Sequence, residues 1–162
     1  MDGAKQAMAP TRKPSPAKDD SDYFDRMSKA IFTAGLNWKM VENKWPAFRK
    51  SFSGFSPAKV SRLTEADVRA LMKDQGIVRN EKKIRATIEN AKAILAIEKE
   101  FGSMKGYVDS FKGHEVRLQS ELQEKFNHIG PSTARMFLWM VDFPLTPTKE
   151  EMMWMKSHPE HQ

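Results

Sequence analysis

The chain contains no cysteine among its 162 residues. This absence excludes disulfide bonds, zinc sites built from thiolates and a cysteine nucleophile. Long hydrophobic runs are also missing, because no segment approaches the roughly 20 apolar residues that a membrane-spanning helix needs. Residues 1–22 lack the apolar run of a signal peptide. We therefore expect a soluble protein of the cytoplasm or the nucleoid, with no membrane partner.

The composition indicates one folded domain with a moderate basic bias. Apolar residues make up 40% of the chain, which is enough to close a single core at this length. Lysine and arginine number 27 against 21 acidic residues, so the net charge is +6 and the pI is about 9.5. Residues 78–92 contain five basic and two acidic side chains. Such a surplus is compatible with a polyanionic partner.

The periodicity of apolar residues predicts an all-α protein. Residues 1–18 mix Ala, Pro, Lys and Ser without periodicity, so we expect a disordered arm over residues 1–20 and one domain over residues 21–162. From Tyr23 onwards apolar residues recur at helical spacing, and no stretch alternates as a strand does. Eight or nine short helices with close turns predict a compact orthogonal bundle.

Caps, glycines and prolines predict where the helices begin and end. The first helix follows Ser21 or Asp22 and stops at Gly35. A second is expected to end at Lys44 and a third to restart at residues 45–46, because proline does not sit deep in a continuous helix. The remaining helices are expected from Pro57, from Thr64 to Asp74, from Asn80 to about Glu100, between Gly102 and Gly113, from Glu115 to Lys125, from Pro131 to Val141, and after Thr148.

Residues 126–137 read as a tight turn that opens a helix. Gly130 permits an unusual backbone angle, and Pro131 presets the first helical φ. Ser132 and Thr133 offer hydroxyls beside amides that have no partner within the helix. Geometry and helix dipole both favour an anion there, such as a nucleic-acid phosphate. An ordinary connection between two helices fits the same stretch.

Three segments resemble a known family in order and spacing. They are Ala-Gly-Leu-Asn-Trp at 34–38, Asp-Gln-Gly-Ile-Val-Arg-Asn at 74–80 followed by Lys-Ile at 83–84, and Ile-Gly-Pro-Ser-Thr at 129–133. Over residues 22–142 the chain resembles the bacterial DNA-3-methyladenine glycosylase I family, which belongs to the helix-hairpin-helix DNA glycosylase superfamily. The resemblance implies a monomeric base-excision repair hydrolase. It would flip a damaged, alkylated base out of double-stranded DNA and hydrolyse the bond between base and sugar.

The resemblance also implies a way of gripping DNA. The amides around Gly130, Ser132 and Thr133 match the family's anchor on the DNA backbone, and Arg135 follows them on the same helix. Three polar side chains within residues 79–83 could contact DNA phosphates, but capping of a helix or simple solvation would explain them as well. These candidates are Arg79, Asn80 and Lys83. Asn80 fits a helix cap better, whereas Arg79 is the better DNA ligand.

Two further parts of a base-flipping protein match the first segment. Gly35 lets the backbone approach DNA closely, and Leu36 fits a wedge between bases, although a core position at a helix start suits Leu36 equally. Trp38 matches the family's pocket tryptophan, whose π-face favours a positively charged alkylated purine.

The sequence departs from the family in the catalytic half. Relatives carry Tyr-His-Asp-x-Glu-Trp-Gly before the first helix, where this chain has an arm ending Pro-Ala-Lys-Asp-Asp at 16–20. The family's pocket glutamate lies eight residues before the tryptophan in a Leu-Glu-Gly run, and this chain has Lys29, Ala30 and Ile31 there. The family's zinc site uses two Cys and two His, so without cysteine we expect neither metal nor cofactor.

These departures leave more than one function open. A divergent glycosylase with altered or weakened chemistry is one possibility, a paralogue that binds distorted or abasic DNA without cutting is a second, and a protein-interaction element is a third. Glu150 lies twenty residues after Gly130, where the wider superfamily commonly places a catalytic aspartate, so it is a candidate catalytic residue as well as a helix cap. No lysine lies between Lys125 and Lys149, which argues against lyase chemistry in the hairpin.

Overall fold

The computed structural model describes residue 10 and residues 12–159. This part of the chain is helical and contains no strand, so the all-α prediction is confirmed. Its elements are α2 (Asp20–Thr33), α3 (Trp38–Ser51), the 3₁₀ turn η1 (Ser53–Phe55), α4 (Pro57–Val60), α5 (Glu65–Leu71), α6 (Glu81–Phe101), α7 (Met104–Asp109), α8 (Glu115–Lys125), α9 (Pro131–Met140) and α10 (Lys149–Ser157). None of these helices combines the length and apolarity needed to cross a membrane.

Most helices begin at a polar side chain that caps their first turn. The Asn80 side chain accepts a hydrogen bond from the Lys83 amide at 3.1 Å, so Asn80 is the cap of α6, as the sequence indicates. Thr64 and Thr148 form capping boxes at the starts of α5 and α10. Because these caps satisfy amides within the first turn, the starts of these helices were readable from local sequence.

The predicted break between two helices at residues 45–46 is wrong, because α3 runs through Pro46 without interruption. Val41, Trp45 and Phe48 are buried on both sides of the proline. An interior proline costs about 3 kcal/mol in a helix, and burial of three large apolar side chains offsets that cost. Tertiary packing therefore keeps α3 continuous where local propensity favours a break.

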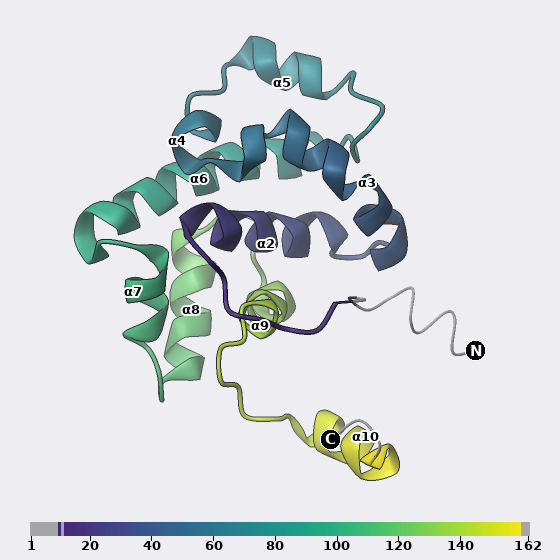
Figure 1. The fold of residues 1–162 in the computed structure, drawn as a ribbon, viewed down its shortest axis with the longest axis vertical. Helices are drawn as coiled ribbons and strands as arrows, with labels where there is room; N and C mark the ends of the chain where they lie inside the picture. Colours follow the sequence, from purple (N-terminus) through teal and green to yellow (C-terminus); the bar gives the residue numbers. More distant parts are fainter. Residues whose placement is uncertain (1–9, 11, 160–162) are drawn as a thin grey trace.

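Helix α2 occupies the centre of the bundle and contacts α3, α6 and α9 (Figure 1). Its apolar side chains are fully buried, among them Phe24, Met27 and Ile31. Helix α9 crosses beneath α2, and the loop after it leads to α10, which lies below the bundle (Figure 1). Because α2 is central, several of its polar side chains are buried as well, among them Asp25 and Lys29.

The N-terminal arm crosses α9 before it enters α2 (Figure 1). The Ser15 amide donates a hydrogen bond to the Met140 carbonyl at 3.5 Å, and the Arg26 side chain binds main-chain carbonyls of residues 15 and 16. Residues 15–18 therefore differ from the expected structureless arm, and α2 begins at Asp20. The disorder expected for residues 1–9 and 11 falls outside the described residues.

Candidate nucleic-acid interface

The first and third segments singled out by the sequence meet at one cavity. It has a volume of about 140 Å³ and lies between the turn after α2 and the start of α9. We call it the anchor cavity, and its lining includes Gly35, Leu36, Trp38, Ser132 and Thr133. The expected wedge, the expected stacking tryptophan and the expected phosphate anchor therefore lie together, although almost 100 residues separate them.

The start of α9 has no side-chain cap, so its first-turn amides have no capping acceptor. Gly130 has φ −91° and ψ −177°, which any residue adopts, so the prediction of an unusual angle at Gly130 is wrong. The positive φ of the hairpin belongs to His128. A Cβ atom at Gly130 would meet nothing within 4 Å. The fold alone therefore does not require glycine at this position.

The turn that carries Leu36 is tight and needs glycine. The Leu36 amide donates to the Thr33 carbonyl at 2.8 Å, and Gly35 has φ +77°. Leu36 is half-buried, since it packs on the core and also lines the anchor cavity. Leu36 therefore has features of a core residue and also faces a cavity, as a wedge between bases would. Its role as a wedge stays a prediction.

Lys83 lies inside the protein, which differs from the expectation of a surface phosphate ligand. Its ammonium donates to the carbonyls of Phe32 at 3.4 Å and Ala34 at 3.1 Å, and burial lowers its pKa. Lys83 thus stabilises the main chain that leads from α2 into the Leu36 turn. Arg79 is exposed beside the start of α6, and its phosphate contact stays a prediction.

Two expected site residues lie away from Trp38. Arg135 binds both carboxylate oxygens of Glu151 at 3.1 and 2.8 Å and donates to the Thr146 carbonyl at 3.0 Å, so it ties α9 to the loop before α10. Glu150 is exposed in the first turn of α10 and lines neither described cavity beside Trp38. Glu151, and not Glu150, provides the capping carboxylate. A catalytic role for Glu150 therefore gains no support from its position.

A second cavity of about 110 Å³, also lined by Trp38, lies between α2, α3, α9 and the arm. We call it the base cavity. Its lining residues are Pro10, Arg12, Lys13, Ser15, Asp22, Asp25, Arg26, Lys29, Trp38, Glu42, Arg49, Trp139 and Met140. Sequence reasoning identified only Trp38 among them. The charged lining residues recur at helical spacing, from Asp22 to Lys29 on α2 and at Glu42 and Arg49 on α3, but such spacing is also typical of a solvated face.

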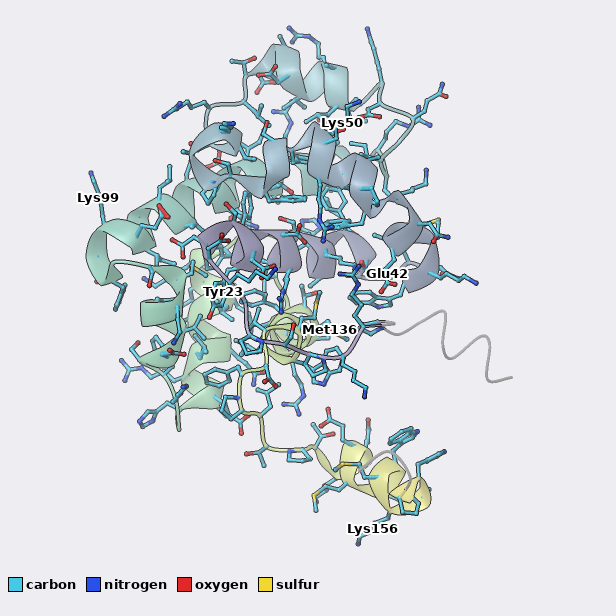
Figure 2. The ribbon with its side chains drawn as sticks, in the orientation of Figure 1. Tyr23, Glu42, Lys50, Lys99, Met136 and Lys156 are labelled. Atoms are coloured by element: carbon cyan, nitrogen blue, oxygen red, sulfur yellow. The ribbon has the colours of Figure 1, made fainter. Side chains whose placement is uncertain are left out.

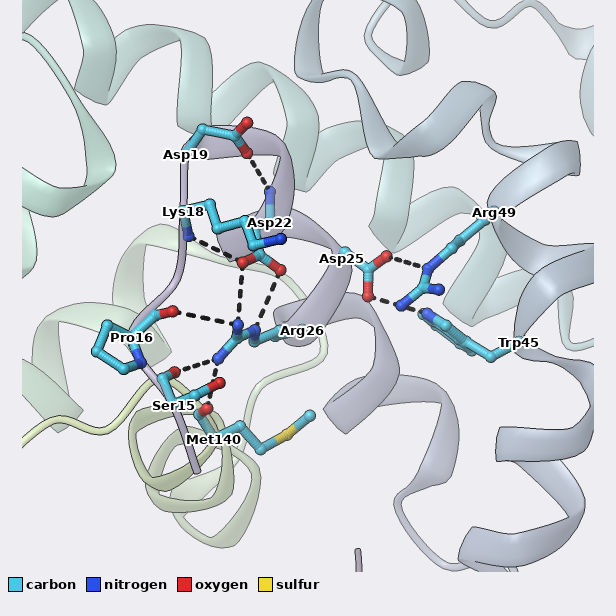
Figure 3. Close-up of polar contacts among 10 residues, drawn as sticks. All are labelled: Ser15, Pro16, Lys18, Asp19, Asp22, Asp25, Arg26, Trp45, Arg49 and Met140. Atoms are coloured by element: carbon cyan, nitrogen blue, oxygen red, sulfur yellow. Dashed lines mark hydrogen bonds and ion pairs between the residues drawn. The ribbon is translucent and has the colours of Figure 1, made fainter. Parts of the chain in front are cut away.

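Asp25 holds α2 and α3 together beside the base cavity. Its two carboxylate oxygens accept hydrogen bonds from Trp45 Nε1 at 2.9 Å and from Arg49 Nε at 2.7 Å (Figure 3). The side chain is only 12% exposed. A buried carboxylate needs such partners, so Asp25 fixes the relative position of the two helices.

Lys29 and Glu42 form a looser ion pair across the same cavity. Their Nζ and Oε1 atoms lie 3.8 Å apart, and their side chains are 11% and 16% exposed. Burial lowers the pKa of Lys29, while the charge of Glu42 acts in the opposite direction. Figure 2 shows Glu42 near the arm, in the region between α2 and α3. The cavity therefore contains a carboxylate close to Trp38 although residue 30 is alanine.

The arm forms one wall of the base cavity because Arg26 fastens it. Asp22 holds the Arg26 guanidinium through two hydrogen bonds of 3.1 and 2.9 Å. The guanidinium donates in turn to the carbonyls of Ser15, of Pro16 at 3.3 Å and of Met140 at 2.8 Å (Figure 3). We call this group the arm latch. It fixes the arm against α2 and the end of α9.

The all-α bundle, in which the Gly35 turn and Trp38 lie beside the start of α9, has a helix-hairpin-helix DNA glycosylase fold. The chain belongs to the methyladenine glycosylase family, whose model matches residues 13–137. It is 36% identical to DNA-3-methyladenine glycosylase 1 of Escherichia coli over 103 residues, which covers 64% of this chain and 55% of that protein. It is 33% identical to the DNA-3-methyladenine glycosylase of Haemophilus influenzae over 100 residues, covering 62% and 54%.

A solved structure shares most of the architecture. The structure that describes 3-methyladenine recognition by the Staphylococcus aureus 3-methyladenine DNA glycosylase I has a TM-score of 0.75 and 25% identity, covering 82% of this chain and 81% of that one. The sequence matches to the two curated relatives are shorter than this structural match. In them, the chain spans about half of the length of each relative.

Proposed function

We propose that this chain is a monofunctional DNA N-glycosylase that removes alkylated bases of the 3-methyladenine type from double-stranded DNA. The anchor cavity carries this proposal, since it joins Leu36, Trp38 and the uncapped start of α9 in one place. The names of the E. coli and H. influenzae relatives support the same substrate class. The protein would act as a monomer on chromosomal DNA in the bacterial cytoplasm.

The geometry suggests how a nucleotide would be held. A phosphate beside the lesion binds the free amides of α9 near Ser132 and Thr133, where the helix dipole favours an anion. Leu36 fills the gap left in the base stack. The expelled base then stacks on Trp38, the residue shared by both cavities, and reaches the base cavity beyond it.

The chemistry requires little acid catalysis from the protein. An N-alkylated purine attached to its sugar carries a positive charge, and it becomes neutral when the bond to the sugar breaks. Such a base leaves without a proton donor. A site that extracts the base and holds it on an aromatic face can therefore promote hydrolysis although residue 30 is alanine and Glu150 lies elsewhere.

Release of free base from alkylated duplex DNA tests the proposal. We expect the wild-type chain to release 3-methyladenine above a protein-free blank, and Trp38→Leu to lower kcat/KM by about tenfold or more, because the stacking face is lost. Trp154→Ala, a change at an exposed tryptophan on α10, is the matched control and should leave release unchanged. Melting temperatures of both variants exclude unfolding as the cause.

The binding-only alternative gives a different result in the same experiment. If no base is released but an abasic-site duplex still binds, the proposal of a glycosylase is wrong. The chain is then a paralogue that binds distorted or abasic DNA without cutting it. This alternative is favoured by one observation, the alanine at position 30 on the wall of the anchor cavity.

A further inference from the structure

Three carboxylates line the base cavity, and all three have partners in the protein. Asp22 belongs to the arm latch, and Asp25 joins α2 to α3. The third, Glu42, lies near the start of α3, four residues after Trp38. Its position, rather than any lack of partners, distinguishes it.

The spacing of Trp38 and Glu42 places a carboxylate beside the stacking face. Residues i and i+4 share one face of a helix, with Cβ atoms about 5–6 Å apart. Both side chains line the base cavity, so they point to the same space. A planar ring lying on the Trp38 indole would present its edge within reach of the Glu42 carboxylate.

Lys29 faces Glu42 from α2, directly before Ala30. This chain differs from the Leu-Glu-Gly pattern of the family at all three positions, because Lys29 replaces the leucine, Ala30 the glutamate and Ile31 the glycine. The ammonium lies 3.8 Å from the carboxylate and offsets part of its charge. A positively charged base at this position is attracted by Glu42 and repelled by Lys29.

We propose that Glu42 is the specificity-determining carboxylate that recognises a base stacked on Trp38, and that Lys29 tunes how strongly it attracts a positively charged base. This inference rests on the proposed function, because it names the residue that would recognise the base next to Trp38. Ala30 lines the anchor cavity and Glu42 lines the base cavity, and Trp38 lines both.

Two substitutions at the ion pair test the inference. Glu42→Gln should lower kcat/KM for 3-methyladenine release by about tenfold or more, because a charged acceptor is lost. Lys29→Met should raise it by about threefold or more, because a like charge is removed. A merely structural pair would lower release in both variants, and that result, or no change in either, overturns the inference.

Two controls separate this inference from the proposed function. Binding to an abasic-site duplex should stay within about twofold for both variants, since the anchor is untouched. Glu65→Gln and Arg85→Met break an exposed ion pair far from the cavity and should change nothing. If the wild-type chain releases no base, the proposed function fails. Calorimetric binding of free 3-methyladenine then decides: weakening by Glu42→Gln supports the inference, and no binding to the wild type overturns it.

Discussion

Asn90 is joined to Asn127 by two hydrogen bonds that run in opposite directions. Asn90 Nδ2 donates to the Asn127 carbonyl at 3.1 Å, and the Asn127 amide donates to Asn90 Oδ1 at 2.7 Å. Asn90 lies in the middle of α6 and is 1% exposed, whereas Asn127 lies in the turn between α8 and α9. The pair therefore holds the hairpin, and with it the proposed anchor, against the longest helix.

Replacement of Asn90 should weaken both the fold and the grip on DNA. Asn90→Leu leaves the amide and carbonyl of Asn127 without their partners, so we expect the free energy of unfolding to fall by about 1–3 kcal/mol. Urea denaturation measures this loss, and fluorescence anisotropy with an abasic-site duplex measures binding. Asn90→Asp keeps the acceptor but buries a carboxylate against the Asn127 carbonyl, so it should destabilise the protein at least as much as Asn90→Leu at neutral pH. Unchanged affinity in a destabilised Asn90→Leu protein would show that the hairpin position does not govern binding.

The arm latch should contribute far more stability than an exposed arginine pair. The Arg26 side chain is 17% exposed, whereas Arg85 is 44% exposed in its pair with Glu65. Arg26→Ala should cost about 1.5–3 kcal/mol in the free energy of unfolding, and Arg85→Ala about 1 kcal/mol or less. Loss of the latch should also expose the arm, so trypsin should cleave after Arg12 faster in Arg26→Ala than in Arg85→Ala. Equal cleavage rates would mean that the arm is held by other contacts.

Local sequence predicted the elements because their signals are local. Polar caps such as Asn80 and Thr64 act within one turn, and the glycine at position 35 enforces a turn by its own backbone. The segments at 34–38 and 129–133 pointed to one site through their resemblance to a family, and the structure brings them together at the anchor cavity.

The features that sequence reasoning missed depend on tertiary packing. Pro46 is tolerated because buried side chains on either side hold α3 together. Asp25, Lys29 and Glu42 recur at the spacing of a solvated helix face, and only the arrangement of α2, α3 and the arm shows that they surround a cavity. The burial of Lys83 also depends on tertiary packing, because its ammonium donates hydrogen bonds to carbonyls at the end of α2.

Stability should decline as the pH rises through neutrality, because of Glu98. A hydrogen bond with Asp20, burial and the charge of Asp20 raise the pKa of Glu98 from 4.5 to about 7. A carboxyl group whose pKa is raised on folding stabilises the protein fully below its unfolded value of 4.5 and loses that contribution as the pH passes about 7. The free energy of unfolding should therefore be higher at about pH 5 than at about pH 8. Glu98→Gln should reduce this difference, whereas Glu150→Gln, at an exposed site, should preserve it.

Gly130 offers the cleanest separation of DNA binding from folding. Its backbone angles suit any residue, and an added Cβ meets nothing within 4 Å. Gly130→Val should therefore change the free energy of unfolding by less than about 1 kcal/mol. If a phosphate approaches the amides of α9, the valine side chain occupies that space. Affinity for an abasic-site duplex should then fall, and the salt slope should decrease by about one, which corresponds to one lost phosphate contact. Unaltered affinity and slope in a stable Gly130→Val protein would remove the hairpin from the DNA interface, because no other property of this position depends on glycine.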